Sequence, residues 1–221
     1  SDDEYRKYFD RFDPDLYDPE LWAKLADEAG MKYFVVTTKH HEGFCLWDSS
    51  FTEYKAPNTP AGRDLLRPML EAFRGRGIRS GLYYSLLDWN HPHYTVDVKH
   101  PLRYNQAFLQ QQQERDFQQY VDYMFRQARE LLTEYGPIDL MFFDFSIPPE
   151  EGFAGKSKEA WQSEKLVKMI RELQPNILLN DRLQVGGDIT TPEQYQPREW
   201  IRVNGQRVVW EACHTFSGSW G

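Results

Sequence analysis

The sequence predicts an α/β protein with a parallel sheet, and in particular an incomplete (β/α)-barrel. Segments with helical periodicity alternate along the chain with short apolar runs, which are typical of strands buried on both faces. The connections between them are mostly short, which favours parallel strands joined by right-handed crossovers. Polar side chains follow nearly every apolar run, as expected where several strand ends share one mouth.

The elements are expected in strict alternation. Helices are expected over residues 21–29, 64–77, 106–135 and 160–173, and strands over 32–38, 78–85, 138–143, 176–180 and 207–212. The glutamine run 110–113 is interpreted as the solvated face of the third helix, and the polar segment 181–206 as a loop. No glycine-rich phosphate loop follows the first strand, which counts against a dinucleotide-binding sheet. We therefore expect one partial-barrel domain over residues 1–221, with about five of the eight strands of a complete barrel.

Composition and charge narrow the classes of partner. A hydrophobic content of 40% with 15% aromatic residues supports a sizeable core, and a net charge of −8 counts against a nucleic-acid surface. No apolar run approaches the ~20 residues of a membrane span. Cys45 and Cys213 are the only cysteines, so a single disulfide stays open. We expect no nucleic-acid partner and no membrane segment.

Residues that could carry chemistry gather at the ends of the expected strands. Glycoside hydrolysis needs one ionised and one protonated carboxyl group, with hydrogen-bonding groups and an aromatic face around the sugar. Asp144, at the end of an unbroken apolar run, is the first candidate, although Asp is also a favoured helix N-cap. The candidates at the strand ends are His40, His41, Tyr83, Tyr84, Asp144, Asn180, Asp181 and Arg182, followed by Asp188, Glu193, Trp210 and Glu211.

Several motifs together resemble one enzyme family. They are TTKHHEGFCLWDS, GLYYSLLDW, FFD, LLNDR, GDITTPEQ and WEACHTFSGSWG. In combination, over roughly residues 10–221, they resemble the retaining α-L-fucosidases, family 29 of the glycoside hydrolases. The resemblance implies a TIM-like catalytic barrel that hydrolyses terminal α-L-fucosyl linkages by double displacement, without a metal or cofactor. The implied partner is a fucosylated oligosaccharide or glycoconjugate, and relatives of this kind are commonly secreted, periplasmic or lysosomal.

The resemblance also implies a role for each matching position. Asp144 matches the nucleophile and Glu193 the acid/base, so their carboxyl groups should lie about 5–5.5 Å apart. The implied sugar contacts are His40, His41 and Tyr83 in the fucose pocket, Phe142 as an aromatic wall where many members carry Trp, Arg182 near the acid/base, and Trp220 on the methyl side of the sugar.

Alternatives remain for several of these positions. Glu211 or Asp188 could replace Glu193 as the acid/base, and Arg182 could pair with Asp181 or Asp144. A metal bound by His40 and His41 is disfavoured because adjacent strand residues point to opposite faces. By the same rule one of Tyr83 and Tyr84 is expected in the core, and the resemblance places Tyr83 in the pocket, which leaves Tyr84 for the core. The loop histidines His91, His93 and His100 are expected at the surface.

The chain also departs from the family pattern. The first strand, which supplies another fucose-binding histidine in the family, and the strands that follow Trp220 are not found in this sequence. A catalytically inactive fragment that at most binds sugar is therefore an alternative, as is, less favoured, a metal-dependent barrel hydrolase. Linkage preference, aglycone and oligomeric state are left open.

Overall fold

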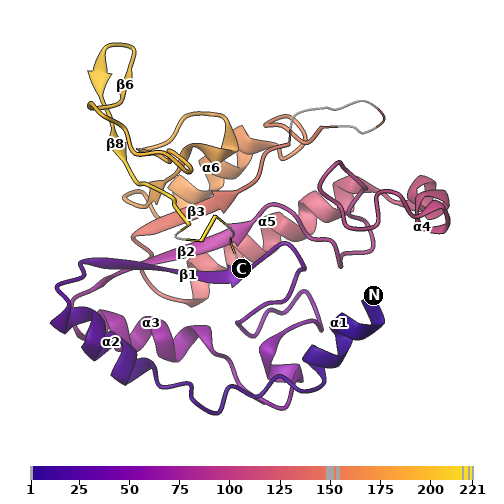
Figure 1. Cartoon of the computed structure of the whole chain (residues 1–221), viewed down its shortest axis with the longest axis horizontal. Helices are drawn as coiled ribbons and strands as arrows, with labels where there is room; N and C mark the ends of the chain where they lie inside the picture. The colour runs from indigo at the N-terminus through magenta and orange to yellow at the C-terminus, as the bar shows by residue number, and fades with distance from the viewer. Residues whose placement is uncertain (1, 148–151, 153–154, 216, 219, 221) are drawn as a thin grey trace.

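A parallel four-stranded sheet forms the centre of the computed structural model, which describes residues 2–147, 152, 155–215, 217, 218 and 220 (Figure 1). Its strands lie side by side in chain order, so each connection is a crossover of the same kind. They are β1 (Tyr33–Lys39), β2 (Arg79–Ser85), β3 (Leu140–Asp144) and β4 (Leu178–Leu179), and every neighbouring pair is parallel.

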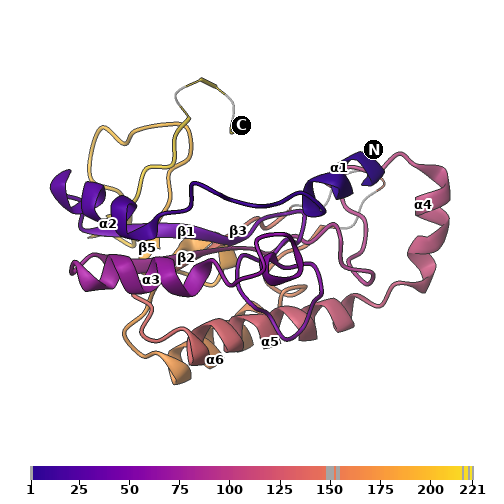
Figure 2. The ribbon, with the colours of Figure 1, turned by 90° about the horizontal axis from the view of Figure 1, so that it is seen from below.

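Helices cover one face of this sheet. Figure 2 shows α3, α5 and α6 on that face, with the C-terminal segment on the other. Helix α2 packs against α3, and α5 against α6. The helices are α1 (Asp2–Phe9), α2 (Pro19–Glu28), α3 (Leu66–Gly75), α4 (Gln106–Gln110), α5 (Phe117–Glu134) and α6 (Ser163–Leu173).

Alternation along the strands gives the sheet two different faces. Leu82, Tyr84 and Phe143 belong to the main core under the helices. Tyr83 and Phe142 point the other way, into a small cluster that also contains Ile189. Tyr84 is therefore a core residue, as predicted, and its hydroxyl donates to Gln127 Oε1 at 2.8 Å.

The sheet does not close into a barrel within the described residues. Beyond β4, Asn180 forms a parallel bridge with Ile189 of β5 (Ile189–Thr190), which pairs in parallel with β8 (Val209–Trp210). The strand sequence thus continues past β4 in the same direction. The predicted α/β fold with a parallel sheet is confirmed, whereas the predicted barrel is represented here by an open sheet.

Two expectations about secondary structure were wrong, and one helix was not expected at all. The helix expected over 106–135 is broken into α4, a 3-10 turn η2 (Gln111–Glu114) and α5. Arg115 is extended because its guanidinium donates to Tyr94 O at 2.6 Å, and Asp116 then caps α5 by accepting from Gln118 N at 3.0 Å. The segment 181–206, expected as a loop, contains a 3-10 turn η3 (Asp181–Leu183), β5 and β6 (Arg202–Val203). Strand β6 forms a hairpin with β7 (Gln206–Arg207), which begins at the end of that segment. Helix α1 was not anticipated. The remaining expected helices and strands are present with shifted ends.

Cys45 and Cys213 are both free, so the open question of a disulfide is answered by two thiols. Cys45 is fully buried and Cys213 half-buried. Among the described residues, no helix has the length and apolar character needed to cross a membrane.

Candidate active site

The carboxyl ends of the four parallel strands bring the predicted residues to one edge of the sheet. Tyr83 lies near the end of β2 and Asp144 ends β3, while His40 and His41 follow β1 directly. Arg182 lies on the short turn η3 that follows β4. This is the edge where parallel α/β sheets build their active sites.

Asp144 is held on both carboxylate oxygens. Tyr83 donates its hydroxyl to Oδ2 at 2.6 Å, and the backbone N–H of Phe145 donates to Oδ1 at 3.0 Å. Burial raises the pKa of Asp144 above its usual value, while the Tyr83 hydrogen bond and the positive charge of Arg182 oppose that rise. The carboxylate is therefore partly desolvated but still supported in its charged form.

The backbone turns sharply directly after this carboxylate. Phe145 has a φ of +70°, in the left-handed region that residues other than glycine rarely adopt. Its ring then meets the edge of the His41 ring, with centroids 4.9 Å apart. The turn ends β3 at Asp144 and directs the following residue toward the histidines.

Arg182 forms an ion pair with one of the two predicted carboxylates and acts on the other through its charge. Its guanidinium lies 2.6 Å from Glu193 Oε2, and its charge also lowers the pKa of Asp144. Glu193 in turn raises that pKa, so both charges act on Asp144. The pairing of Arg182 with Asp181 or Asp144, which was weighed as an alternative, is not what forms: the direct partner is Glu193.

A backbone clamp that sequence reasoning missed positions Glu193. Cys213 N donates to Pro192 O at 3.0 Å, and Gln194 N donates to Cys213 O at 2.9 Å, so the residues flanking Glu193 are tied to the segment after β8. Gln194 has a φ of +59°, and its side-chain amide donates to Thr215 Oγ1 at 3.1 Å. The only available sequence signal was the proximity of TTPEQ to ACHT within one polar region.

The two alternative carboxylates lie elsewhere. Glu211 accepts a hydrogen bond from the hydroxyl of Tyr33 at 3.0 Å, and Tyr33 starts β1, at the opposite end of that strand from His40. Asp188 is paired with Arg171 and accepts from Leu179 N at 2.8 Å. Neither is the carboxylate that meets Arg182.

The two histidines lie together, contrary to the expectation that they face opposite sides. Their ring centroids are 3.9 Å apart, because β1 has already ended at Lys39 and the strand rule no longer applies. His40 Nδ1 lies 3.3 Å from Glu42 Oε2, and His41 Nδ1 lies 2.7 Å from Ser85 Oγ. No group of three or more His, Cys, Asp or Glu side chains in the described part of the chain is placed to hold a metal ion.

His41 is neutral in this environment. Burial lowers its pKa to about 3, and the charges of His40 and Lys39 add to that effect. His91 resembles it, since burial lowers its pKa to about 4. The expectation that the loop histidines lie at the surface was wrong for His100, which is only 1% exposed.

Aromatic rings form one wall beside Asp144. Tyr83 and Phe142 stack with centroids 5.6 Å apart, and His40 stacks on the other side of Tyr83 at 5.7 Å. Trp220, expected on the sugar's methyl side, is 61% exposed, while Ser219 and Gly221 of the same motif lie outside the described residues. Phe142 is thus part of the wall, and Trp220 is a surface side chain in this structure.

A buried ion pair supports the histidine loop from behind. Lys39 Nζ lies 3.2 Å from Asp88 Oδ2, and both side chains are almost fully buried. Gly43 has a φ of +88°, and a Cβ on it would lie 2.3 Å from Asp88 Oδ1. Only glycine therefore lets the loop carrying His40 and His41 approach this pair.

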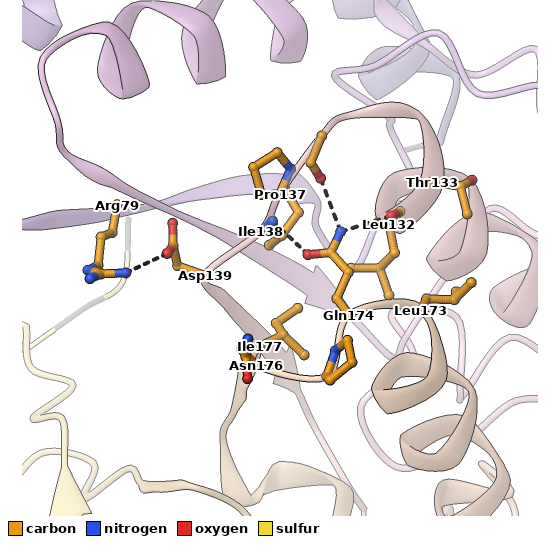
Figure 3. A pocket seen from close by; sticks show the side chains of 12 residues that line it. Arg79, Leu132, Thr133, Pro137, Ile138, Asp139, Leu173, Gln174, Asn176 and Ile177 are labelled. Atoms are coloured by element: carbon orange, nitrogen blue, oxygen red, sulfur yellow. Dashed lines mark hydrogen bonds and ion pairs between the residues drawn. The ribbon is translucent and has the colours of Figure 1, made fainter.

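A cavity of about 470 Å³ lies at the opposite end of the sheet (Figure 3). Arg79 pairs with Asp139 at its rim, 2.9 Å apart. The Gln174 amide fills its hydrogen bonds with three backbone groups, those of Leu132, Gly136 and Ile138. These polar groups satisfy one another within the fold.

Comparisons with known proteins agree on one family. The family profile described as Alpha-L-fucosidase matches residues 1–221. The solved α-L-fucosidase isoenzyme 1 from Paenibacillus thiaminolyticus is 48% identical, with a TM-score of 0.90 over 99% of this chain and 53% of that one.

More distant relatives carry the same name. An α-L-fucosidase from Bacteroides thetaiotaomicron, trapped as a covalent intermediate with 2-fluoro-fucosyl fluoride, is 31% identical, with a TM-score of 0.78 over 96% of this chain and 48% of that one. The α-L-fucosidase of Dictyostelium discoideum is 27% identical over 98% of this chain and 44% of its own length. The chain thus spans about half the length of the relatives it matches. It belongs to the α-L-fucosidases, family 29 of the glycoside hydrolases.

Proposed function

We propose that this chain carries the catalytic centre of a retaining α-L-fucosidase that hydrolyses terminal α-L-fucosyl linkages. The observation that carries the proposal is the pair of carboxylates on separate segments at the carboxyl edge of a parallel sheet: Arg182 forms an ion pair with Glu193, and its charge lowers the pKa of Asp144. The match of the whole chain to the α-L-fucosidase family indicates that the sugar is α-L-fucose. The open sheet then forms part of a (β/α)-barrel.

In this mechanism Asp144 is the nucleophile. Its carboxylate attacks the anomeric carbon, the bond to the leaving oxygen breaks, and a glycosyl ester forms. Tyr83 fixes the direction of the attacking oxygen, because its hydroxyl already donates to Oδ2 at 2.6 Å. The trapped covalent intermediate of the Bacteroides relative supports a step of this type.

Glu193 acts first as the acid that protonates the leaving oxygen, and then as the base that takes a proton from water. At 42% side-chain exposure it can reach a substrate arriving from solvent. Glu193 is ion-paired with Arg182, so proton transfer to the leaving oxygen requires that pair to loosen or reorient. The second displacement regenerates Asp144 and releases fucose with its original configuration.

The test uses 2-fluoro-fucosyl fluoride as a trap. We expect one equivalent of adduct, located on Asp144 by peptide mass spectrometry, and no adduct in the Asp144→Asn variant. Proton NMR of the first turnover of an aryl α-L-fucoside should show the α-anomer of fucose. An initial β-anomer, or an adduct on another residue, would overturn the assignment. Calorimetric fucose binding without hydrolysis would reduce the chain to a sugar-binding module.

A further inference from the structure

The hydrogen bonds around Ser85 determine the protonation state of each His41 ring nitrogen. Ser85 ends β2 and is fully buried, and in the sheet it pairs with Asp144. Three polar groups surround its hydroxyl: Leu87 O at 2.9 Å, Leu87 N at 3.0 Å and His41 Nδ1 at 2.7 Å. A hydroxyl has one proton to donate and two lone pairs with which to accept.

Counting donors and acceptors indicates that Ser85 donates its hydroxyl proton to the carbonyl oxygen of Leu87. Leu87 is fully buried, and no other group in the described part of the chain donates to its carbonyl oxygen. Leaving a buried carbonyl without a partner costs about 1–3 kcal/mol. The Leu87 N–H can only donate, so it uses one lone pair of Ser85 Oγ. The remaining lone pair faces His41 Nδ1, which must therefore carry a proton.

His41 is neutral, so only one ring nitrogen is protonated. With the proton on Nδ1, Nε2 keeps its lone pair, and no described residue bonds to it. Phe145, Trp89 and His40 pack around the ring and fix its plane. Ser85, which the ring contacts, pairs with Asp144 across the sheet.

We propose that Ser85 is a positioning residue: it holds His41 as the Nδ1–H tautomer, so that Nε2 accepts a hydrogen bond from a hydroxyl group of the bound sugar. The inference about the tautomer is independent of the activity, whereas the role toward sugar rests on the proposed function. An acceptor fixed in this way requires a hydroxyl on the ligand and penalises a sugar that lacks it, because the imidazole nitrogen would then stay unpaired.

The first measurement is made on the protein without sugar. With ¹⁵N-labelled histidine, long-range ¹H–¹⁵N correlation at pH 7 should show His41 Nδ1 as the protonated nitrogen and Nε2 as the unprotonated one. Addition of fucose should move the Nε2 resonance upfield, as expected for a lone pair that accepts a hydrogen bond. A wild-type spectrum with the proton on Nε2 would overturn the proposal, even if the protein hydrolyses fucosides.

The Ser85→Ala variant tests the cause. We expect the Nε2–H tautomer of His41 to become populated and kcat/KM on an aryl α-L-fucoside to fall about 10–100-fold, the usual scale for a residue that orients a ligand. Ser80→Ala is the matched control, since Ser80 is also fully buried on β2 but its hydroxyl has no partner among the described residues. That variant should keep the wild-type His41 spectrum and kcat/KM. An unchanged His41 tautomer in folded Ser85→Ala would contradict the proposal.

Deoxy sugars locate the hydrogen bond. The test uses fucosides that each lack one ring hydroxyl. Removing the hydroxyl that bonds to Nε2 should lower kcat/KM less in Ser85→Ala than in wild type, whereas removing any other hydroxyl should lower kcat/KM equally in both proteins. Equal losses in wild type and Ser85→Ala for every analogue would contradict the proposed hydrogen bond from the sugar to Nε2. The inferred tautomer is tested separately by the spectrum of His41. If no fucoside is hydrolysed at all, the proposed function fails and the spectrum of His41 decides the tautomer alone.

Discussion

Strand β3 lies between two aspartates, and the two ends of the sheet use them differently. Asp139, just before β3, accepts hydrogen bonds on both carboxylate oxygens, from the Arg79 guanidinium at 2.9 Å and from the backbone N–H of Ser80 at 2.9 Å. Asp144, at the other end, is held by a hydroxyl and one N–H, and its pKa is raised by burial. The cavity of about 470 Å³ lies at the Asp139 end. The proposed active site is therefore placed at a carboxylate whose pKa is perturbed and not at the largest hollow described in the surface.

Exchanging each aspartate for asparagine should separate the two ends most strongly. Asp144→Asn should lower kcat by about 10³-fold or more, because the nucleophile is lost. Asp139→Asn should leave kcat near wild type but lower the free energy of unfolding by about 1–3 kcal/mol, since it weakens a hydrogen bond and an ion pair. Aryl-fucoside kinetics and urea unfolding measure the two effects. Comparable loss of kcat in both variants would contradict the distinction.

The arginines at the two ends form the next pair. Arg182→Gln should reduce kcat/KM by about 10²-fold, because the cation beside both carboxylates is removed. It should also raise the pKa of Asp144 further, since the Arg182 charge lowers that pKa. Arg79→Gln, at a side chain that is 74% exposed, should retain wild-type kinetics. Wild-type kinetics in Arg182→Gln would show that the pair is only structural.

Tyr83→Phe should have a smaller effect with a distinct pH signature. The Tyr83 hydroxyl stabilises ionised Asp144, so its removal raises the pKa of that carboxyl. The acid limb of kcat/KM should then move to higher pH, because a larger fraction of Asp144 is protonated at each acidic pH. Activity at the pH optimum should fall only about tenfold. An acid limb that does not move would contradict the claim that the Tyr83 hydroxyl lowers the pKa of the proposed nucleophile.

Acid should weaken the histidine-bearing end gradually. The pKa of His91 is lowered to about 4, below its unfolded value of about 6.5, so the unfolded chain binds more protons between these values. Stability is thus lost as pH falls from about 6.5 to about 4, by at most about 1.4 kcal/mol per pH unit for this residue, and by less because the ring is partly exposed.

His91→Gln should flatten this dependence in urea unfolding between those pH values. Gln174→Ala, at the opposite end of the sheet, provides the control, because it removes hydrogen bonds but no titrating group. It should lower the free energy of unfolding equally at each pH. A wild-type slope in His91→Gln would mean that the ring is protonated in the folded protein.

The sequence predicts the sheet better than it predicts the loops. The first three strands are recognisable because each is an apolar run followed by polar residues, and burial on both faces demands that pattern. The short strands β5, β6 and β7 carry no such signal, since each has two residues and those of β6 and β7 are exposed, whereas β8 lies inside the expected strand 207–212. The break at Arg115 depends on Tyr94, a contact distant in sequence.

The same limit applies to the site. The placement of Asp144 and Tyr83 at one edge of the sheet could be predicted from strand ends and motif resemblance. Strand alternation put one of Tyr83 and Tyr84 in the core, and the resemblance left that place to Tyr84. The alternation rule failed for His40 and His41 because the strand stops one residue before them. Ser85, Cys213 and Gln194 could not be found, because their roles arise from the hydrogen bonds that folding creates.

The left-handed turn at Phe145 has a consequence for engineering. A non-glycine residue with φ near +70° stores roughly 1–3 kcal/mol of conformational energy, which glycine would release. Glycine would also lose the ring that packs against the main core and on His41, and it would add freedom to the unfolded chain, so the gain from relieved strain is outweighed. Phe145→Gly should therefore lower heat resistance as well as turnover, and an engineer gains nothing by relaxing the backbone at this codon.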